Sequence, residues 1–452
     1  MKLRLSGISA AIFVSAAVIV TGCGSNTNQS QEQARSSSAP TAQTAFPACA
    51  ASASWVSAPN PPAEIGGGPG IQPPPVGQET FCQFYQFAEQ WFLQLVSQSS
   101  TPDTRIYETF NVVGDSGSTD CNTSARLTGK AALRKSLFVR VNKPPTADFD
   151  PVLPANMGQA GSGDALYDQN GNVVLYAMLY NNTECQATPA GFAPNTIEVK
   201  TSWKVLAAPD PSYYTMTATV NFSTGPKNLI LGLVGFHMAI NTALHPEFIW
   251  VTFEHKTNAP DCNKPKTADG WSFTSAAAAQ CLINSGISGC SQYKFNTGAK
   301  PSTPTGGPPT QVCRTYPNGT DPVPPEVGPN GNRNALNDFT IDTLNDQLVG
   351  TSGILTQLPA SNPMAVFAHY QMEGSIWTNG GQDSVTANQR GSLELVNTTM
   401  ETFEQNAPPT SNKNCFGCHN FSTQSPLAVS HIYQGTTEKI AALKRQALKK
   451  KK

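Results

Sequence analysis

Charged side chains are scarce in this chain. Asp, Glu, Lys and Arg make up 13% of its 452 residues, whereas soluble domains contain about 25%. A nucleic-acid-binding protein needs basic residues gathered on one surface, so this composition argues against that class of partner. The sequence also lacks a Gly-rich phosphate-binding loop, a nucleophile elbow, a metalloprotease motif and an internal repeat. Gly and Pro, with 36 residues each, and an apolar content of 39% indicate a loop-rich extracytoplasmic protein with enough apolar residues for a core.

The N-terminus has the pattern of an export signal. Two basic residues precede an apolar run over residues 8–20, which is too short for a membrane-spanning helix of about 20 residues. Residues 20–23, Val-Thr-Gly-Cys, resemble the bacterial lipobox, which implies that residues 1–22 are a signal peptide and that Cys23 is lipidated. Gly24 stands where inner-membrane lipoproteins have Asp, so we expect a lipid anchor on the periplasmic side of the outer membrane. The alternative is an ordinary secretory signal in which Cys23 is incidental.

Composition divides the rest of the chain into segments. Residues 23–79 are of low complexity and cannot bury enough surface to fold, so we expect a tether there. We expect one main domain over residues 80–377, with a Pro- and Gly-rich insertion at 298–333, and a C-terminal segment over residues 378–438. Residues 439–452 contain seven Lys and Arg and no acid. This tail is either solvated or contacts an acidic partner or an anionic membrane.

Residue periodicity predicts an α+β fold built on an antiparallel sheet, with flanking helices and the C-terminal segment packed against it. Apolar residues recur at helical spacing from Phe81 to Leu95. Stretches rich in β-branched and aromatic residues predict strands over residues 173–180, 196–205, 213–222, 229–240, 248–254 and 365–377. Weaker patterns predict helices over residues 129–139, 391–404 and 438–449.

The chain contains 11 cysteines. Lipidation and the motif described next account for three of them, and the even remainder fits four disulfides in an oxidising compartment. Closeness along the chain predicts that Cys49 pairs with Cys82. It also predicts pairing within the group from Cys262 to Cys313.

Residues 415–419, Cys-Phe-Gly-Cys-His, form the Cys-x-x-Cys-His pattern of c-type haem attachment. The thiols of Cys415 and Cys418 can add to the two haem vinyl groups, while His419 presents its imidazole to the iron as the proximal ligand. We therefore expect one covalent haem c as cofactor. Two alternatives stay open: a redox-active disulfide, which normally follows a strand in a βαβ unit, and half of a zinc knuckle.

The second axial ligand of the iron is less clearly defined. Because 33 residues follow His419, the main domain must supply the opposite wall of the haem site. An open position would permit peroxide or small-gas chemistry. The candidate ligands are His237 or His431, then Met400, with His255 and Met372 behind them.

Two places put an acid beside a base, as general acid–base catalysis requires. They are His245-Pro246-Glu247 and the pair Glu254–His255. Neighbours in a strand point to opposite faces, so Glu254 and His255 should not share a site. We interpret both places as structural and assign no catalytic residue.

Several blocks of sequence resemble a group of uncharacterised bacterial proteins, the cytochrome c family protein group, many of which are lipoproteins. The similarity lies in residues 167–172, 197–206, 232–237, 250–255, 258–261, 397–402 and 415–419. The resemblance implies haem binding and electron transfer and leaves the substrate and the partner open. The Pro-rich insertion and the Lys-rich tail have no counterpart in that group.

These observations lead to the hypothesis of a membrane-anchored, extracytoplasmic c-type cytochrome with one haem, which exchanges electrons with redox partner proteins. One alternative is a peroxidase-like haem enzyme with an open axial position. Another is a structural lipoprotein without haem, in which Cys415 and Cys418 form a disulfide.

Overall fold

The computed structural model describes residues 49–62, 64–65, 80–112, 138–139, 165–222, 225–263, 265, 267–298, 307–320, 329–406, 414–430 and 433. The predicted signal peptide, Cys23, most of the expected tether, His431, the basic tail and the helix expected over residues 438–449 lie outside these residues. The described residues all fall within one compact unit, Phe46–Lys452. Within the described part, no helix is both long and apolar enough to cross a membrane.

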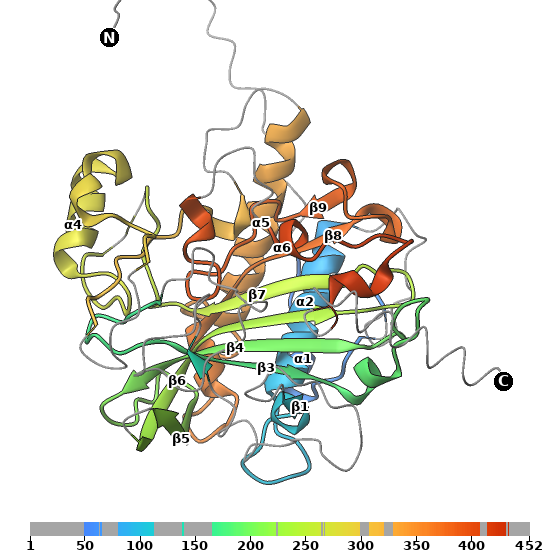
Figure 1. Ribbon diagram of the computed structural model, residues 1–452, viewed down its shortest axis with the longest axis horizontal. Coiled ribbons are helices and arrows are strands. Elements are labelled where there is room, and N and C mark those ends of the chain that lie inside the picture. Colours follow the sequence, from blue (N-terminus) through green and yellow to red (C-terminus); the bar gives the residue numbers. More distant parts are fainter. Residues whose placement is uncertain are drawn as a thin grey trace, which may run out of the picture. The chain divides into compact units, whose positions relative to one another are not determined.

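A nine-stranded antiparallel sheet organises this unit (Figure 1). Its strand order is β1-β3-β4-β6-β7-β8-β9, and β2 pairs with β3 while β5 pairs with β6. The fold is therefore α+β, as the sequence predicts. The strands are β1 (Asn111–Val112), β2 (Phe138–Val139), β3 (Leu175–Tyr180), β4 (Ile197–Leu206), β5 (Thr215–Phe222), β6 (Gly225–Ile240), β7 (Ile249–His255), β8 (Tyr370–Thr378) and β9 (Gln389–Gly391).

One face of the sheet is apolar and is covered by α2 (Phe81–Val96). The helix begins with a capping box, in which Thr80 and Gln83 satisfy each other's backbone N–H groups. Its aromatic residues face the sheet, and Phe92 stacks on Phe253 of β7 with ring centroids 3.9 Å apart. The regular helical spacing of these residues is the reason why the sequence predicts this helix correctly.

A second helix, α5 (Pro329–Val349), packs beside α2 on the same face. Ile341, Leu344 and Leu348 are buried in the shared core. The Asn345 side chain bonds both the N–H and the carbonyl of Met372 in β8, which fixes the helix to the sheet. The expected insertion at 298–333 therefore ends inside a helix.

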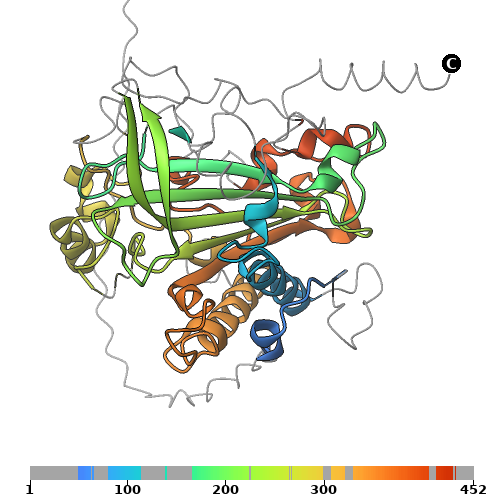
Figure 2. The ribbon, with the colours of Figure 1, turned by 90° about the horizontal axis from the view of Figure 1, so that it is seen from below.

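The opposite face of the sheet, called the polar face below, carries charged and polar side chains between two smaller apolar clusters, and the C-terminal segment lies on it (Figure 2). Lys200 of β4, His237 of β6 and Thr252 of β7 are neighbours across the strands. Two glycines allow close approach of the covering segment. A Cβ added at Gly235 would lie 2.5 Å from the Thr399 hydroxyl, and one at Gly374 would also meet the segment.

The predicted disulfide groupings are confirmed where the structure describes them. The bonds are Cys49–Cys82, Cys262–Cys313 and Cys281–Cys290, and Cys185 is also disulfide-bonded. Two of these bonds brace a lobe that contains α4 (Ala276–Ser285), which the sequence analysis missed. A short helix, α1 (Ser54–Ser57), follows the first bond, and Cys49, Val56 and Ile65 are buried in the core. The expectation of an unfolded tether up to residue 79 is therefore wrong for this part of the chain, because the disulfide and these apolar side chains fix it to the main domain.

Three predicted elements differ from the structure. The helix expected over residues 391–404 is wrong: β9 ends at Gly391, turns follow, and a 3-10 turn begins at Glu404. The strand expected over residues 365–377 begins later, because Ala365–His369 is a 3-10 helix. Only the last two residues of the helix expected over 129–139 are described, and they form β2.

Candidate functional site

The Cys-x-x-Cys-His motif forms a short helix, α6 (Cys415–Cys418), with His419 directly after it. Asn414 caps the helix by accepting a hydrogen bond from the Phe416 N–H. Residues three apart in a helix lie on the same side, so Cys415 and Cys418 can both face one planar group. Among the described cysteines, these are the two that remain thiols.

His419 is buried to 8% exposure, and its ring is held in a defined orientation. Nδ1 lies 2.9 Å from the carbonyl oxygen of Val429. A carbonyl can only accept, so Nδ1 carries the proton and the lone pair lies on Nε2. Metal-binding histidines are commonly fixed by a second-nitrogen hydrogen bond of this kind.

Trp250 of β7 supports the same ring. Its indole stacks on the His419 imidazole with centroids 4.4 Å apart and an interplanar angle of 26°. A metal approaches an imidazole in the plane of the ring at the nitrogen, whereas Trp250 covers the face. The stack therefore restricts the orientation of the His419 ring.

The motif is anchored to the sheet at several points. The Asn414 side chain donates to the Gln389 side chain of β9 at 2.8 Å and to the Leu393 carbonyl at 2.7 Å. Phe416 and Phe421 are both 2% exposed and belong to one apolar cluster with Trp250. The segment is therefore packed on the main domain, as the sequence predicts.

A charged cluster lies near the motif on the polar face. Glu401 accepts from Lys200 at 3.3 Å and contacts His237 Nε2 at 2.7 Å. Burial raises the pKa of the Cys415 thiol well above its ordinary value, and the negative charge of Glu401 adds to this shift while Lys200 opposes it. The Cys415 thiol of the folded protein is therefore protonated at neutral pH.

The candidate second ligands are placed very differently. His237 is bound to Glu401, so it would have to leave this partner to reach a metal. Met400 is fully buried in an apolar cluster on the polar side of the sheet. His255 and Met372 lie on the apolar side, with Phe253, away from His419. His431 lies outside the described residues.

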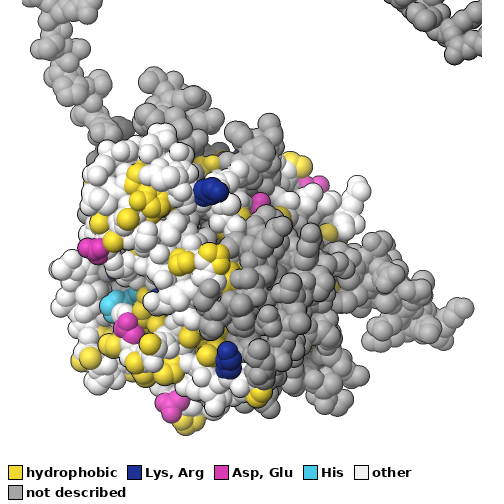
Figure 3. All heavy atoms as spheres, turned by 60° about the vertical axis from the view of Figure 1, so that its left-hand side comes forward, with side chains coloured by type: hydrophobic (Ala, Val, Ile, Leu, Met, Phe, Trp, Pro, Cys, Tyr) yellow, Lys and Arg dark blue, Asp and Glu magenta, His cyan; other side chains and the backbone are white. Residues whose placement is uncertain are grey.

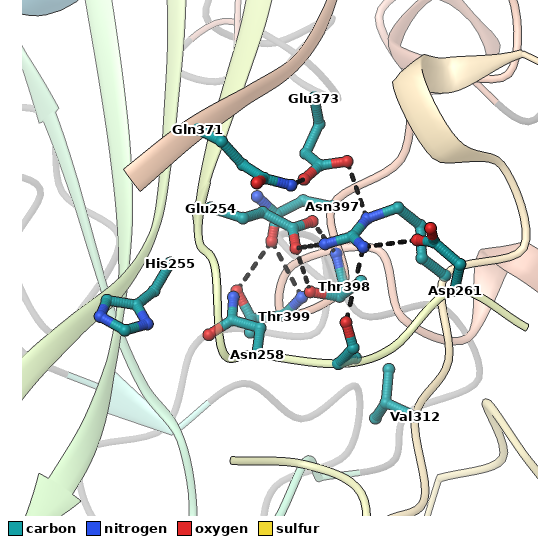
Figure 4. Close-up of polar contacts among 12 residues, drawn as sticks. Glu254, His255, Asn258, Asp261, Val312, Gln371, Glu373, Asn397, Thr398 and Thr399 are labelled. Carbon is teal, nitrogen blue, oxygen red and sulfur yellow. Dashed lines mark hydrogen bonds and ion pairs between the residues drawn. The ribbon is translucent and has the colours of Figure 1, made fainter. Parts of the chain in front are cut away.

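Sequence reasoning missed a buried ion cluster around Arg314 (Figure 4). Its guanidinium lies 3.0 Å from Glu254, 2.8 Å from Asp261 and 2.7 Å from Glu373. Thr398 of the C-terminal segment donates to Glu254 through both its N–H and its hydroxyl. Burial raises the pKa of Glu373 to about 8, while Arg314 opposes this shift. The cluster joins three loop segments to strands β7 and β8, so its role is structural.

Of the two acid–base pairs that the sequence suggests, only His245 and Glu247 are in contact with each other. Glu254 and His255 point to opposite sides of β7, as predicted (Figure 4). Burial lowers the pKa of His255 to about 3, so it stays neutral. His245 and Glu247 do touch, at 2.8 Å, but both are fully buried beneath α2. They are therefore part of the core.

A cavity of about 1000 Å³ lies at the other end of β7, where Lys256, His369 and Asp210 line it. Its lining includes no residue of the motif. On the face drawn in Figure 3, hydrophobic side chains form small groups and charged side chains are few, in keeping with the composition.

Fold and site together define an α+β protein whose Cys-x-x-Cys-His segment is packed on the polar face of an antiparallel sheet. Comparison of the chain with protein-family models, with curated proteins and with solved structures found no match. The residues present fit a covalently bound haem: two thiols on one side of a helix, followed by a histidine whose lone pair lies on Nε2.

Proposed function

We propose that this protein is an extracytoplasmic c-type cytochrome with one haem, which carries electrons between redox partner proteins. The observation that carries the proposal is the hydrogen bond from His419 Nδ1 to the Val429 carbonyl, next to two thiols that are not joined in a disulfide. This hydrogen bond selects the tautomer that a proximal iron ligand needs. A redox-active Cys-x-x-Cys pair would need neither this histidine nor its orientation.

Each residue of the motif has a separate role in the proposal. Cys415 and Cys418 hold the haem through thioether bonds, and His419 binds the iron. When bound, the haem supplies one-electron oxidation and reduction. Trp250 and Val429 keep the imidazole of His419 in one orientation, and Phe416 helps to exclude water from the site.

The state of the Cys415 thiol bears on the order of assembly. The thiolate is the reactive form of cysteine, and burial keeps the Cys415 thiol protonated in the folded protein. We therefore expect haem attachment to precede the packing of the C-terminal segment on the sheet.

The second axial ligand remains part of the proposal. His431 and His237 are the two histidine candidates, and His237 would first have to leave Glu401. The variants His431→Ala and His237→Ala distinguish them, because loss of the true ligand should produce a high-spin ferric spectrum and new carbon monoxide binding. A high-spin spectrum in the unmutated protein would instead favour the peroxidase-like alternative.

The proposed location follows from the N-terminal sequence. Lipidation at Cys23 would attach the protein to the outer membrane on its periplasmic side, and residues 24–45, which precede the compact unit, would act as the tether. We expect Cys23→Ala to release the protein from the membrane fraction with its haem content unchanged. A Cys23→Ala protein that stays with the membranes would contradict lipid anchoring.

The test of the proposal is a pyridine haemochrome spectrum of the purified protein after acid–acetone extraction. We expect about one haem per chain to remain bound, and none in the double variant Cys415→Ala/Cys418→Ala. The matched control is Cys281→Ala/Cys290→Ala, which removes a disulfide from the α4 lobe and should retain haem. Haem that washes out of the unmutated protein, or its complete absence, would contradict the proposal.

A further inference from the structure

Two carboxyl groups are buried against each other beside the motif. Glu184 lies in a 3-10 helix, Asn182–Gln186, and Glu198 lies in β4. Glu184 is 0% exposed and Glu198 is 2% exposed, and the two carboxyl groups lie close enough for Glu198 to raise the pKa of Glu184. Two buried carboxylates this close repel each other, so the pair favours a state in which one of the two carries a proton.

The surroundings of the pair explain why it holds this proton. Burial raises the pKa of Glu184 well above its ordinary value, and the nearby charge of Glu198 raises it further. The Ser430 hydroxyl donates to Glu184 at 2.8 Å and partly opposes the shift. The other titratable groups that face the pair are Tyr180 of β3, Tyr433, and Lys200, which stands two residues from Glu198 on β4 and binds Glu401.

The pair lies close to His419 both along the C-terminal segment and across the sheet. Ser430, which donates to Glu184, directly follows Val429, whose carbonyl holds His419 Nδ1. Across the sheet, Glu198 and Trp250 lie two strands apart. Glu198 stands opposite Ala239, and Ala239 stands opposite Trp250, which stacks on His419. Two strand spacings separate Glu198 from Trp250, or about 10 Å.

We propose that the pair Glu184–Glu198 is the proton-exchange site of this protein, which takes up one proton from water when the motif region gains one electron and releases it when the electron leaves. This inference rests on the proposed function. The pair carries one proton before reduction and two after it: the electron comes from a one-electron donor protein, and the proton from water joins the carboxylate that is still ionised, so charge and atoms balance. In a poorly solvated site, an added negative charge favours protonation of a nearby acid. By linkage, protonation of the pair favours reduction to the same degree.

The experiment is a redox titration of the full haem-loaded chain from pH 5 to pH 9, followed by optical spectra. Proton uptake on reduction makes the reduced form less favourable as the pH rises. We expect the equilibrium to shift up to tenfold per pH unit, which corresponds to about 59 mV for one electron. We expect this slope to flatten in Glu184→Gln and also in Glu198→Gln.

Glu89→Gln is the matched control. Glu89 is a buried acid in α2, on the opposite side of the sheet, and its replacement should leave the slope unchanged. A pH-independent potential in the unmutated protein, or an unaltered slope in both pair variants, would overturn the inference while leaving the proposed function intact. A chain without covalent haem would overturn the proposed function and this inference with it.

A second measurement needs no variant. Infrared difference spectra of the reduced minus the oxidised protein should show a gain of carboxylic acid C=O absorption that shifts in D₂O. Glu184 and Glu198 are enclosed and should exchange protons as a unit, so one band is expected. The absence of any carboxylic acid signal would overturn the inference.

Discussion

On the face of the sheet that α2 and α5 cover, the side chains are apolar, whereas under the C-terminal segment many are charged or polar. The apolar face uses ring stacking, as between Phe92 and Phe253. The polar face uses paired charges, such as those of Glu254 and Arg314. Apolar packing stabilises the fold but does not depend on the direction of approach, whereas a buried hydrogen bond or ion pair forms only when its two groups are correctly placed and oriented. This difference explains how a segment with little regular secondary structure can hold His419 in one orientation.

The first prediction concerns the apolar face and has the largest expected effect. Phe92→Ala removes a fully buried ring that contacts Phe236, Phe253 and Phe367. We expect the free energy of unfolding to fall by about 4 kcal/mol, measured by urea denaturation. Haem content per folded chain should stay unchanged. A loss of haem from the folded variant would contradict the separation of roles between the two faces.

The second prediction concerns an acid on the helical side of the sheet. Burial raises the pKa of Glu89 from 4.5 to about 8. Its neutral form is therefore favoured in the folded state, and stability should be greatest below pH 4.5 and decline as the pH rises to about 8. Glu89→Gln should remove this decline and stabilise the protein by about 3 kcal/mol at pH 7.

The measurement for Glu89 is urea denaturation at several pH values for both proteins. Glu373→Gln is the comparison on the polar face, where Arg314 compensates the acid at 2.7 Å. The replacement removes one charged partner of Arg314, so we expect a lower free energy of unfolding for Glu373→Gln than for the unmutated protein at pH 9, where Glu373 is ionised. Parallel stability curves for Glu89→Gln and the unmutated protein would contradict the account of Glu89.

The third prediction has the smallest effect on stability. Trp250→Phe replaces the indole that stacks on His419 with a smaller ring. We expect the free energy of unfolding to fall by about 1 to 2 kcal/mol. We also expect a shifted midpoint potential and altered proton NMR shifts of the ferric protein. Trp377→Phe is the matched control, because Trp377 stacks on Phe84 at 3.8 Å on the apolar face. Equal changes in potential for both variants would contradict a specific role for Trp250.

The parts of the fold that sequence predicts are those with regular periodicity. The helical spacing of aromatic residues gives α2, and runs of β-branched residues give most of β3 to β7. The helix α5 was missed because its sequence begins Pro-Asn-Gly-Asn and carries few apolar residues, so only tertiary packing of Ile341, Leu344 and Leu348 identifies it.

The region over residues 391–404 was predicted wrongly for a different reason. Its polar side chains compete with helical hydrogen bonds: Asn397 accepts from the Thr399 N–H, and Thr398 donates to Glu254. The motif residues 415–419 could be found because they are contiguous. Their supports, Trp250 and Val429, could not, because a contact between β7 and the C-terminal segment leaves no local pattern in the sequence.

The measurement that tests the central claim most directly is the mass of the tryptic peptide Asn414–Lys439 from protein produced with haem-attachment machinery. This peptide contains Cys415, Cys418 and His419. We predict that it carries the mass of one haem and that the added mass is lost in Cys415→Ala/Cys418→Ala. A peptide lighter by two hydrogens than the free dithiol, with no added group, would show a Cys415–Cys418 disulfide and contradict the account.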